Sequence, residues 1–339
     1  ELTQQMQKLL DRLQRRLKEF DQVNDKNPDT PAHLIQMSKK EIFDEFTKHF
    51  DAAWEAVKDF EKEKYVLHQK YYQQMIGKYM LDPVEINRHI YRKPLGYAGD
   101  FMVMNYIYDY HGKRYLGRNC YEQLINHYTS NIGISRSNIK RKEFFKEKIL
   151  ALLDYADSPR ILSIGCGSAR ELIELIKEGE FVKTAQFTCF DLEEKALQFV
   201  RDSIEQIEKE KTRYLSMKYV HQNILFLLKN KNDIIEKLGQ YDFIYVSGLF
   251  DYLSDRIADR LVKKIFSLLA SRGVFILCNA CRDKARHRVY YEMLGDWKLI
   301  YRTEEEILSW TKDIADLDDA RIVNVNSDIE YLFLEMRKK

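Results

Sequence analysis

The stretch that decides the fold of this chain is Arg160-Ile161-Leu162-Ser163-Ile164-Gly165-Cys166-Gly167-Ser168-Ala169-Arg170-Glu171. An apolar run ends in a pair of glycines, and a helical pattern begins directly after it. The next apolar run, 186–190, is followed at once by Asp191. A strand, a glycine-rich turn, a helix and a second strand ending in an acid form a nucleotide-binding unit. The glycines let the backbone approach the ligand, and the acid binds ribose hydroxyls.

The chain after this stretch alternates short apolar runs with amphipathic segments, a pattern typical of a parallel sheet with crossover helices. A capping box at Thr303-Glu304-Glu305-Glu306 predicts one further helix. We expect strands at 160–164, 186–190, 217–221, 241–246 and 273–278, a closing antiparallel pair at 320–326 and 329–336, and helices at 168–177, 193–209, 230–238 and 255–270. This order predicts an α/β fold with a seven-stranded, Rossmann-like sheet.

The glycine turn also discriminates between cofactors. A dinucleotide fingerprint needs a third glycine, and Arg170 stands at that position. The run instead resembles the first motif of class I S-adenosylmethionine-dependent methyltransferases, in which an acid is followed by x-G-x-G-x-G. Gly165 and Gly167 match that motif, whereas Ser163 replaces the acid and Ala169 replaces the last glycine. The resemblance implies S-adenosylmethionine as the cofactor.

In sheets of this kind ligands bind at the carboxyl ends of the strands, beside the switch in strand order. The residues predicted to bind the cofactor all follow a predicted strand in this way. They are Ser163, Gly165, Cys166, Gly167, Asp191, Leu192, Asn223, Ile224, Ser247 and Gly248. Asp191 can also be read as a helix cap, and Asn223 as a turn residue.

Residues 1–150 differ in character, and we expect a helical region there and the cofactor-binding domain at 151–339. Leu9, Leu10, Leu13 and Leu17 lie on one face of a first helix, and a proline-containing break follows at 27–31. Two more helices are predicted at 38–60 and 64–79, with an aromatic packing stripe. We also expect a homodimer to form through these N-terminal helices.

Residues 87–105 combine two glycines, a proline, several aromatic side chains and several charges, which is typical of a functional loop. The stretches 93–100 (K-P-L-G-Y-A-G-D), 248–253 (G-L-F-D-Y-L) and 296–302 (D-W-K-L-I-Y-R) resemble a bacterial methyltransferase family. Its members are described as making the methyl ester of 3-hydroxypalmitic acid, an extracellular signalling factor. The resemblance spans about residues 85–339 and implies a fatty acid carboxylate as the acceptor.

Methyl transfer to a carboxylate needs no general base, because the acceptor is already an anion at neutral pH. It needs cationic or hydroxyl groups that position the acceptor, since the catalyst mainly holds the two reactants together. The predicted catalytic residues are Tyr97, Asp100, Arg136, His287 and Tyr290. A hydroxyl or amine acceptor, as in natural-product methyltransferases, would instead need a base, and His287 is the leading candidate. A non-catalytic S-adenosylmethionine-binding scaffold is the alternative outside the enzymes.

Composition limits the choice further. The formal net charge of +2 in 339 residues gives no field that would demand nucleic acid, so we expect a small-molecule partner. Five cysteines without paired spacing indicate a reducing, cytoplasmic location, and the isolated Cys278-x-x-Cys281 pair does not predict a metal site. No apolar run approaches the roughly 20 residues that a membrane span needs.

Overall fold

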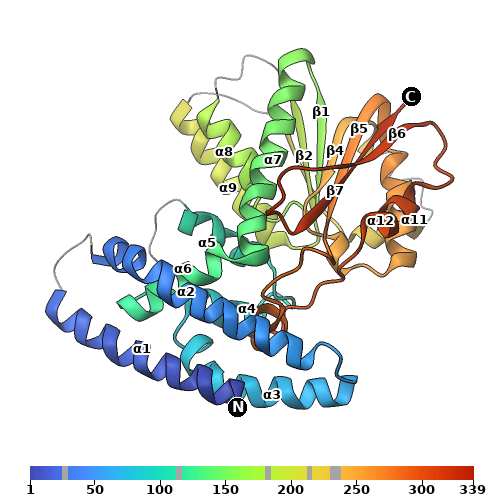
Figure 1. Cartoon of the computed structure of the whole chain (residues 1–339). Coiled ribbons are helices and arrows are strands. Elements are labelled where there is room, and N and C mark those ends of the chain that lie inside the picture. Colours follow the sequence, from blue (N-terminus) through green and yellow to red (C-terminus); the bar gives the residue numbers. More distant parts are fainter. Residues whose placement is uncertain (25–29, 112–116, 180–184, 212–215, 230–237) are drawn as a thin grey trace. The chain divides into compact units, whose positions relative to one another are not determined.

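The computed structural model describes residues 1–24, 30–111, 117–179, 185–211, 216–229 and 238–339 (Figure 1). The chain divides into two compact units. The helical unit consists of residues 1–136 together with 286–298, and the sheet unit consists of 137–285 together with 299–339. The units meet at residues 136 and 137, whereas the predicted boundary was at 150. Both positions lie in the long helix 133–155, and the aromatic side chains of this helix pack on the sheet.

The helical unit contains α1 (Leu2–Asn24), α2 (Thr30–Val57), α3 (Lys62–Met80), α4 (Glu85–Arg92), α5 (Phe101–His111) and α6 (Cys120–Asn131). Met6, Leu10, Leu13 and Leu17 of α1 are buried, and α1 packs against α3 and α6. The predicted leucine stripe is therefore used inside the unit. The predicted break at 27–31 lies largely outside the described residues.

The predicted loop at 87–105 is too long, because helices occupy both of its ends. Ile86 and Ile90 are one helical turn apart and buried, which accounts for α4. At the other end, Asp100 caps α5, and its Oδ1 accepts the N–H groups of Met102 (3.0 Å) and Val103 (3.1 Å). Only residues 93–100 lie between the two helices.

Segment 286–298 joins the helical unit although it follows the fifth strand in sequence. It forms the π-helix η3 (Val289–Leu294), whose residues are all buried. The ring centroid of Tyr290 lies 5.0 Å from that of Phe50 and 5.5 Å from that of Tyr128. A Cβ on Gly295 would lie 3.0 Å from Cγ2 of Ile90, so glycine permits the close approach of this segment to α4.

The sheet unit has the predicted seven strands in the order β3-β2-β1-β4-β5-β7-β6. They are β1 (Arg160–Ile164), β2 (Gln186–Asp191), β3 (Ser216–His221), β4 (Tyr241–Val246), β5 (Leu269–Ala280), β6 (Leu317–Val323) and β7 (Tyr331–Lys338). The first five are parallel, and β7 runs antiparallel to β5 and β6. The predicted fold class is confirmed.

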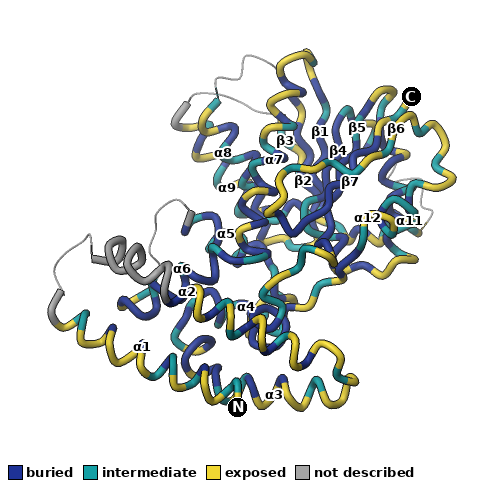
Figure 2. The backbone as a smooth tube through the Cα atoms, viewed as in Figure 1, coloured by how far each residue is buried: buried dark blue, intermediate teal, exposed yellow. Residues whose placement is uncertain are grey.

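Helices cover both faces of this sheet (Figure 1). One face carries α7 (Gly133–Tyr155), α8 (Arg170–Glu178) and α9 (Glu194–Lys211), and Phe145 of α7 lies 5.0 Å from the ring of Tyr245 in β4. On the other face α11 (Asp255–Phe266), α12 (Glu304–Leu308), and the short helices η1 (Ile224–Lys229) and η4 (Ser309–Thr311) close an apolar core. The central strands are buried along almost their whole length (Figure 2).

Several predicted boundaries in the sheet unit are wrong. The helix predicted to reach residue 270 ends at Phe266, and β5 already begins at Leu269, because the apolar run there satisfies either pattern. The last two strands are also displaced by two or three residues. The capping box at Thr303 and Glu306 is confirmed, whereas the helix predicted at 230–238 lies almost entirely outside the described residues.

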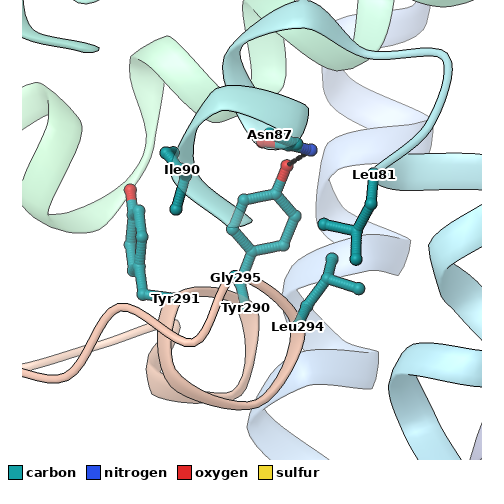
Figure 3. A pocket seen from close by; sticks show the side chains of 7 residues that line it. All are labelled: Leu81, Asn87, Ile90, Tyr290, Tyr291, Leu294 and Gly295. Atoms are coloured by element: carbon teal, nitrogen blue, oxygen red, sulfur yellow. Dashed lines mark hydrogen bonds between the residues drawn. The ribbon is translucent and has the colours of Figure 1, made fainter. Parts of the chain in front are cut away.

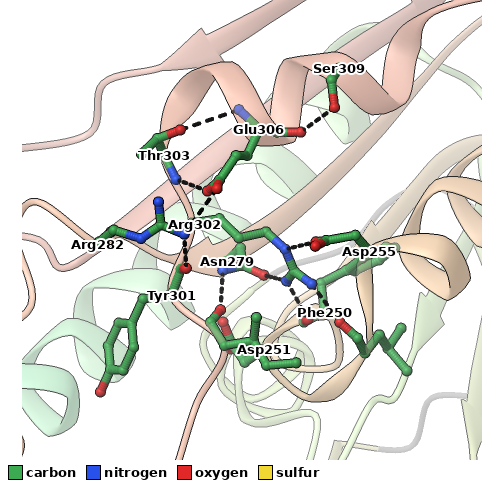
Figure 4. Close-up of polar contacts among 12 residues, drawn as sticks. Phe250, Asp251, Asp255, Asn279, Arg282, Tyr301, Arg302, Thr303, Glu306 and Ser309 are labelled. Carbon is green, nitrogen blue, oxygen red and sulfur yellow. Dashed lines mark hydrogen bonds and ion pairs between the residues drawn. The ribbon is translucent and has the colours of Figure 1, made fainter. Parts of the chain in front are cut away.

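A buried guanidinium ties the carboxyl ends of β4 and β5 to the chain that enters α12 (Figure 4). Arg302 is 1% exposed and donates to Asn279 Oδ1 (2.6 Å), to the carbonyls of Phe250 (2.9 Å) and Leu253, and to Asp255 Oδ1 (2.8 Å). It also lies over the ring of Trp310. These bonds join the stretches 248–253 and 296–302, the second and third of the three stretches that resemble the bacterial family.

We expect Arg302→Met to lower the free energy of unfolding by about 3 kcal/mol, because it leaves several buried acceptors without a donor. Arg282→Met is the matched control, since Arg282 makes a half-exposed ion pair with Glu306 and its loss should cost less than about 1 kcal/mol. Urea unfolding followed by circular dichroism measures both. Equal effects of the two substitutions would contradict a structural role for Arg302.

Candidate functional site

The turn after β1 has the backbone geometry that a closely bound ligand requires. Gly165 (φ 61°), Gly167 (φ 52°) and Ala169 (φ 41°) all adopt left-handed conformations. The N–H groups of Gly165 and Cys166 donate to the carbonyl of Phe190 at 2.8 and 3.2 Å. The turn is thereby fixed to the end of β2.

Asp191 lies at that end of β2 and is largely buried. Its Oδ2 accepts the N–H of Gly167 and its Oδ1 accepts the N–H of Glu193, each at 2.8 Å. Burial raises the pKa of Asp191, while these backbone donors oppose the rise. Each carboxylate oxygen can accept a second hydrogen bond. The two acceptor oxygens therefore fit two ribose hydroxyls, and this contact stays a prediction. The reading of Asp191 as the helix cap is wrong, because α9 begins at Glu194 and Glu193 Oε1 accepts the N–H of Lys195 there.

The side chains of Ser163 and Cys166 are buried within the sheet unit. Sγ of Cys166 lies 3.7 Å from the carbonyl of Gly167 and is hydrogen bonded to the Cys189 thiol. Ser163 hydrogen bonds to Tyr245, whose hydroxyl donates to Glu171 Oε1 at 2.8 Å. A cofactor contact of Cys166 would therefore use its backbone.

Glu171 was not predicted, although it places a buried acid close to the position where Ser163 replaces the motif's acid. It lies in the first turn of α8, and burial raises its pKa. The sequence offered one indication of this buried acid, which is that Glu171 closely follows the glycine turn.

The outer part of the predicted cofactor site lies at the ends of β2 and β3. Leu192 is 61% exposed and forms an apolar surface beside Asp191. Asn223 Oδ1 accepts the N–H of Leu225 at 2.8 Å and so caps η1, while Ile224 is buried in the core. The contact of Asn223 with adenine stays a prediction.

The end of β4 holds a charged group, the guanidinium of Arg141. The carbonyl of Ser247 accepts a hydrogen bond from the thiol of Cys278 (3.1 Å). A Cβ on Gly248 would lie 3.2 Å from Nη1 of Arg141, so glycine admits the guanidinium to this strand end. Asp251 lies nearby, with Oδ1 accepting the N–H of Ala280 at 2.6 Å. Burial raises the pKa of Asp251 to about 6, against the opposing effects of that N–H and of Arg141 and Arg302.

The predicted catalytic residues all belong to the helical unit. Asp100 is fully buried, and its Oδ2 lies 2.8 Å from Nε2 of His89 in addition to capping α5. Tyr97 is 38% exposed in the segment between α4 and α5. Arg136 is the fourth residue of α7. It is also the last residue of 1–136, the first of the two segments that form the helical unit. Lys93, from the same motif as Asp100, donates to Asp296 Oδ2 at 2.5 Å, so the first and third motifs also meet.

Tyr290 and His287 lie in the interior of this unit. The hydroxyl of Tyr290 bonds to Asn87 Nδ2 (2.7 Å) and Thr129 Oγ1 (2.5 Å), and burial raises its pKa. His287 has a left-handed backbone (φ 57°), and its Nε2 lies 3.3 Å from Thr47 Oγ1. Its Nδ1 is buried and finds no hydrogen-bond partner among the described residues, and burial lowers its pKa.

A small apolar cavity beside Tyr290 is lined by Leu81, Asn87, Ile90, Tyr290, Tyr291, Leu294 and Gly295 (Figure 3). Its free space corresponds to about one water molecule. It cannot hold an acyl chain in this conformation. Among the described residues, no cluster of three or more His, Cys, Asp and Glu could bind a metal, and no helix is long and apolar enough to cross a membrane.

Several solved structures are similar to this chain. A possible exported protein from Bordetella parapertussis is 14% identical, with a TM-score of 0.54 over 70% of this chain and 79% of that one. Magnesium protoporphyrin IX methyltransferase from Synechocystis is 15% identical, with a TM-score of 0.44 over 61% and 85%. The N-methyltransferase NodS from Bradyrhizobium japonicum is 16% identical, with a TM-score of 0.39 over 58% and 87%. No curated protein sequence matches the chain.

The match to a protein family is more informative. Residues 137–317 match the family model described as a methyltransferase domain, and the match begins at the first residue of the sheet unit. It covers more than half of the 339 residues. It confirms the methyltransferase activity and the S-adenosylmethionine cofactor expected from the glycine turn and Asp191. The chain therefore belongs to this methyltransferase family.

Proposed function

We propose that this methyltransferase esterifies the carboxylate of a small apolar or hydroxy fatty acid. The observation that carries the proposal is the state of the groups that could act as bases. The hydroxyl of Tyr290 is held by two partners and its pKa is raised. The burial of His287 lowers its pKa, so its imidazole is a weak base. A carboxylate acceptor needs neither group, because it is ionised at neutral pH.

The residues of the sheet unit would hold the methyl donor, which supplies an electrophilic methyl group when bound. The turn at Gly165–Gly167 lets the backbone approach it, and Asp191 accepts its ribose hydroxyls. The acceptor carboxylate must then lie in line with the methyl group, at about 3 Å, with water excluded. Tyr97 and Arg136 are the proposed acceptor-positioning residues of the helical unit. Arg suits this role because its planar fork matches a carboxylate.

One observation favours a second function, methylation of a hydroxyl or amine in a small natural product. Nδ1 of His287 is buried and has no hydrogen-bond partner among the described residues, which is the condition of a base that awaits a proton donor. The two functions differ in whether His287 takes part in the chemistry.

Three further expectations complete the proposal. The five cysteines are all free thiols, which agrees with a cytoplasmic location. A homodimer through the N-terminal helices would have to use the polar faces of α1, because its leucine stripe is buried within the unit. The near-neutral chain favours a small-molecule acceptor over nucleic acid.

Asp191→Ala should weaken binding of S-adenosylhomocysteine by about 1–3 kcal/mol, because the ribose hydroxyls lose their acceptor. Asp242→Ala is the matched control, since Asp242 also accepts a backbone N–H (Arg160, 2.8 Å) but lies at the amino ends of the strands. Isothermal calorimetry measures both variants. Unchanged affinity of the Asp191 variant would remove this residue from the site.

Esterification should proceed at a nearly constant rate from about pH 6 to 9, because the acceptor carboxylate titrates near pH 4 to 5. A reaction that uses His287 as the base would instead rise with pH through a limb below the ordinary histidine pKa of 6.5, because the pKa of His287 is lowered. We expect His287→Asn to leave the profile and the rate of esterification nearly unchanged. Asn is used because it tolerates the positive φ. Loss of an acid limb in this variant would favour the second function.

Tyr97→Phe should lower turnover without changing the melting temperature, because the side chain is partly exposed. Asp100→Ala should lower the free energy of unfolding by about 1–2 kcal/mol, because α5 loses its cap. Asp100→Asn retains a capping side chain but removes the charge. It therefore separates the role of Asp100 as the cap of α5 from its predicted catalytic role. Full activity in both Tyr97→Phe and Asp100→Asn would show that the segment is structural.

A further inference from the structure

We propose that His89, oriented by the buried carboxylate of Asp100, binds the carboxylate of the methyl acceptor. In this role His89 is a catalytic residue, because it contacts the acceptor, whereas Asp100 is a positioning residue that acts through His89. The inference rests on the proposed function, since it takes an acid as the acceptor. It gives Asp100 a task in addition to its cap of α5.

The imidazole of His89 is held by a carboxylate that belongs to the core of the helical unit. Nε2 of His89 lies 2.8 Å from Oδ2 of Asp100, which is 0% exposed. Oδ1 of Asp100 accepts two backbone N–H groups at the start of α5, those of Met102 and Val103. The carboxylate is therefore fixed at both oxygens. The ring of Tyr106 packs against the imidazole at 76°, with the centroids 5.6 Å apart, so the imidazole is held on a second side.

The partner of Nε2 decides which ring nitrogen is available to a ligand. A carboxylate only accepts hydrogen bonds, so Nε2 of His89 carries the proton and donates to Asp100. Nδ1 of His89 has no hydrogen-bond partner among the described residues. Unlike Nδ1 of His287, it is not one of the buried polar atoms that lack a partner, and the His89 side chain is 16% exposed. Nδ1 is therefore the ring atom that can meet a ligand.

The charges around this ring suit an anion. In its protonated form His89 pairs with the charge of Asp100, and charges inside proteins are normally paired. Nδ1 then also carries a proton, and it can donate a charge-assisted hydrogen bond to a carboxylate. Another histidine–carboxylate pair, His221 with Glu194, is more than half exposed on both sides, so water screens it.

The cations next to His89 differ in what they contact. Arg88 donates to the carbonyl of Asp82 at 2.6 Å, and Lys93 is held in an ion pair. Arg92 follows His89 by three residues and so lies on the same face of α4. It is exposed and has no partner among the described residues. We therefore expect Arg92 to add attraction for an anion that is bound at His89.

The pair also lies beside a residue proposed to position the acceptor. α4 ends at Arg92 and α5 begins at Phe101, and the segment between them contains Tyr97. The bond between His89 and Asp100 ties the last turn of α4 to the end of this segment. His89 and Tyr97 thus belong to one part of the helical unit.

The test uses octanoate as the acid and 1-octanol as its neutral analogue of equal chain length. Isothermal calorimetry on the full chain, with saturating S-adenosylhomocysteine, measures both affinities. The wild-type chain should bind octanoate more tightly than octanol. We expect His89→Gln to weaken octanoate by about tenfold, as for the loss of a charge-assisted hydrogen bond, and octanol by less than about twofold. Arg92→Gln should weaken octanoate by about two- to threefold, because an exposed charge is screened.

Asp100→Asn tests the positioning role, because Asn retains a capping side chain but removes the charge that orients His89. Octanoate should bind more weakly to this variant, whereas octanol should not. Combined with His89→Gln, it should weaken octanoate no further than His89→Gln alone, because Asp100 acts through His89. Additive losses in the double variant would contradict that role. Arg88→Gln is the matched control on α4, and it should leave both affinities within about twofold.

Equal losses of both ligands in His89→Gln, or unchanged octanoate binding in that variant, would overturn the proposal. Octanoate binding by the wild-type chain that is no tighter than octanol binding would overturn it as well. Ester formation from S-adenosylmethionine and octanoate is measured separately by mass spectrometry. If octanoate binding depends on His89 but no ester forms, the esterification proposal fails and the carboxylate site at His89 stands.

If His89→Gln does not fold, as judged by circular dichroism, chemical modification of the wild-type chain replaces it. Diethylpyrocarbonate modifies accessible imidazole nitrogens, and peptide mass spectrometry locates the adduct on His89. Saturating octanoate should slow this modification at least about fivefold, because it covers Nδ1, and octanol should slow it less than about twofold. Equal protection by the two compounds, or no protection by octanoate, would overturn the proposal.

Discussion

The hydrogen bond from the Gly167 N–H to Asp191 couples the two elements that we propose bind the cofactor. It joins the turn after β1 to the acid after β2, and the carbonyl of Phe190 fixes the same turn from the other side. Parallel pairing of β1 with β2 brings their carboxyl ends to one edge, so this contact follows from the register of the sheet. The groups that follow β4 and β5 lie at the same edge, because these two strands continue the parallel order beside β1.

The three sequence stretches that resembled one bacterial family are connected in space within each unit. Lys93 of the first pairs with Asp296 of the third in the helical unit. Phe250 and Asp251 of the second bond to Arg302 and Ile300 of the third in the sheet unit. The third stretch therefore takes part in both units, and its residues divide between them at 298 and 299. Much of what makes these stretches distinctive is structural, since Arg302 and Asp100 hold backbone groups and helix ends.

The sheet was predictable because its strands are short apolar runs separated by clear turn residues. β1 and β4 begin and end where the sequence predicted. The start of β5 was not predictable, because Leu268, Leu269 and Ala270 continue a helical pattern as well as a strand pattern. The burial of Arg302, Asp251 and Arg141 was also beyond sequence reasoning. Charged residues are exposed by default, and only tertiary contacts identify the exceptions. The same holds for segment 286–298, because only the tertiary contacts of Tyr290 and Tyr291 assign it to the helical unit.

That segment has a consequence for the order in which the molecule is made. The interior of the helical unit includes Tyr290 and Tyr291, which hydrogen bond to Thr129 and Ser135. Domains generally fold from the N-terminus during synthesis. Here the first 136 residues lack part of their core until the ribosome has passed residue 298. By then five of the seven strands have been synthesised. The N-terminal unit must therefore be completed late, and its exposed aromatic surface is a point at which the nascent chain would need protection from aggregation.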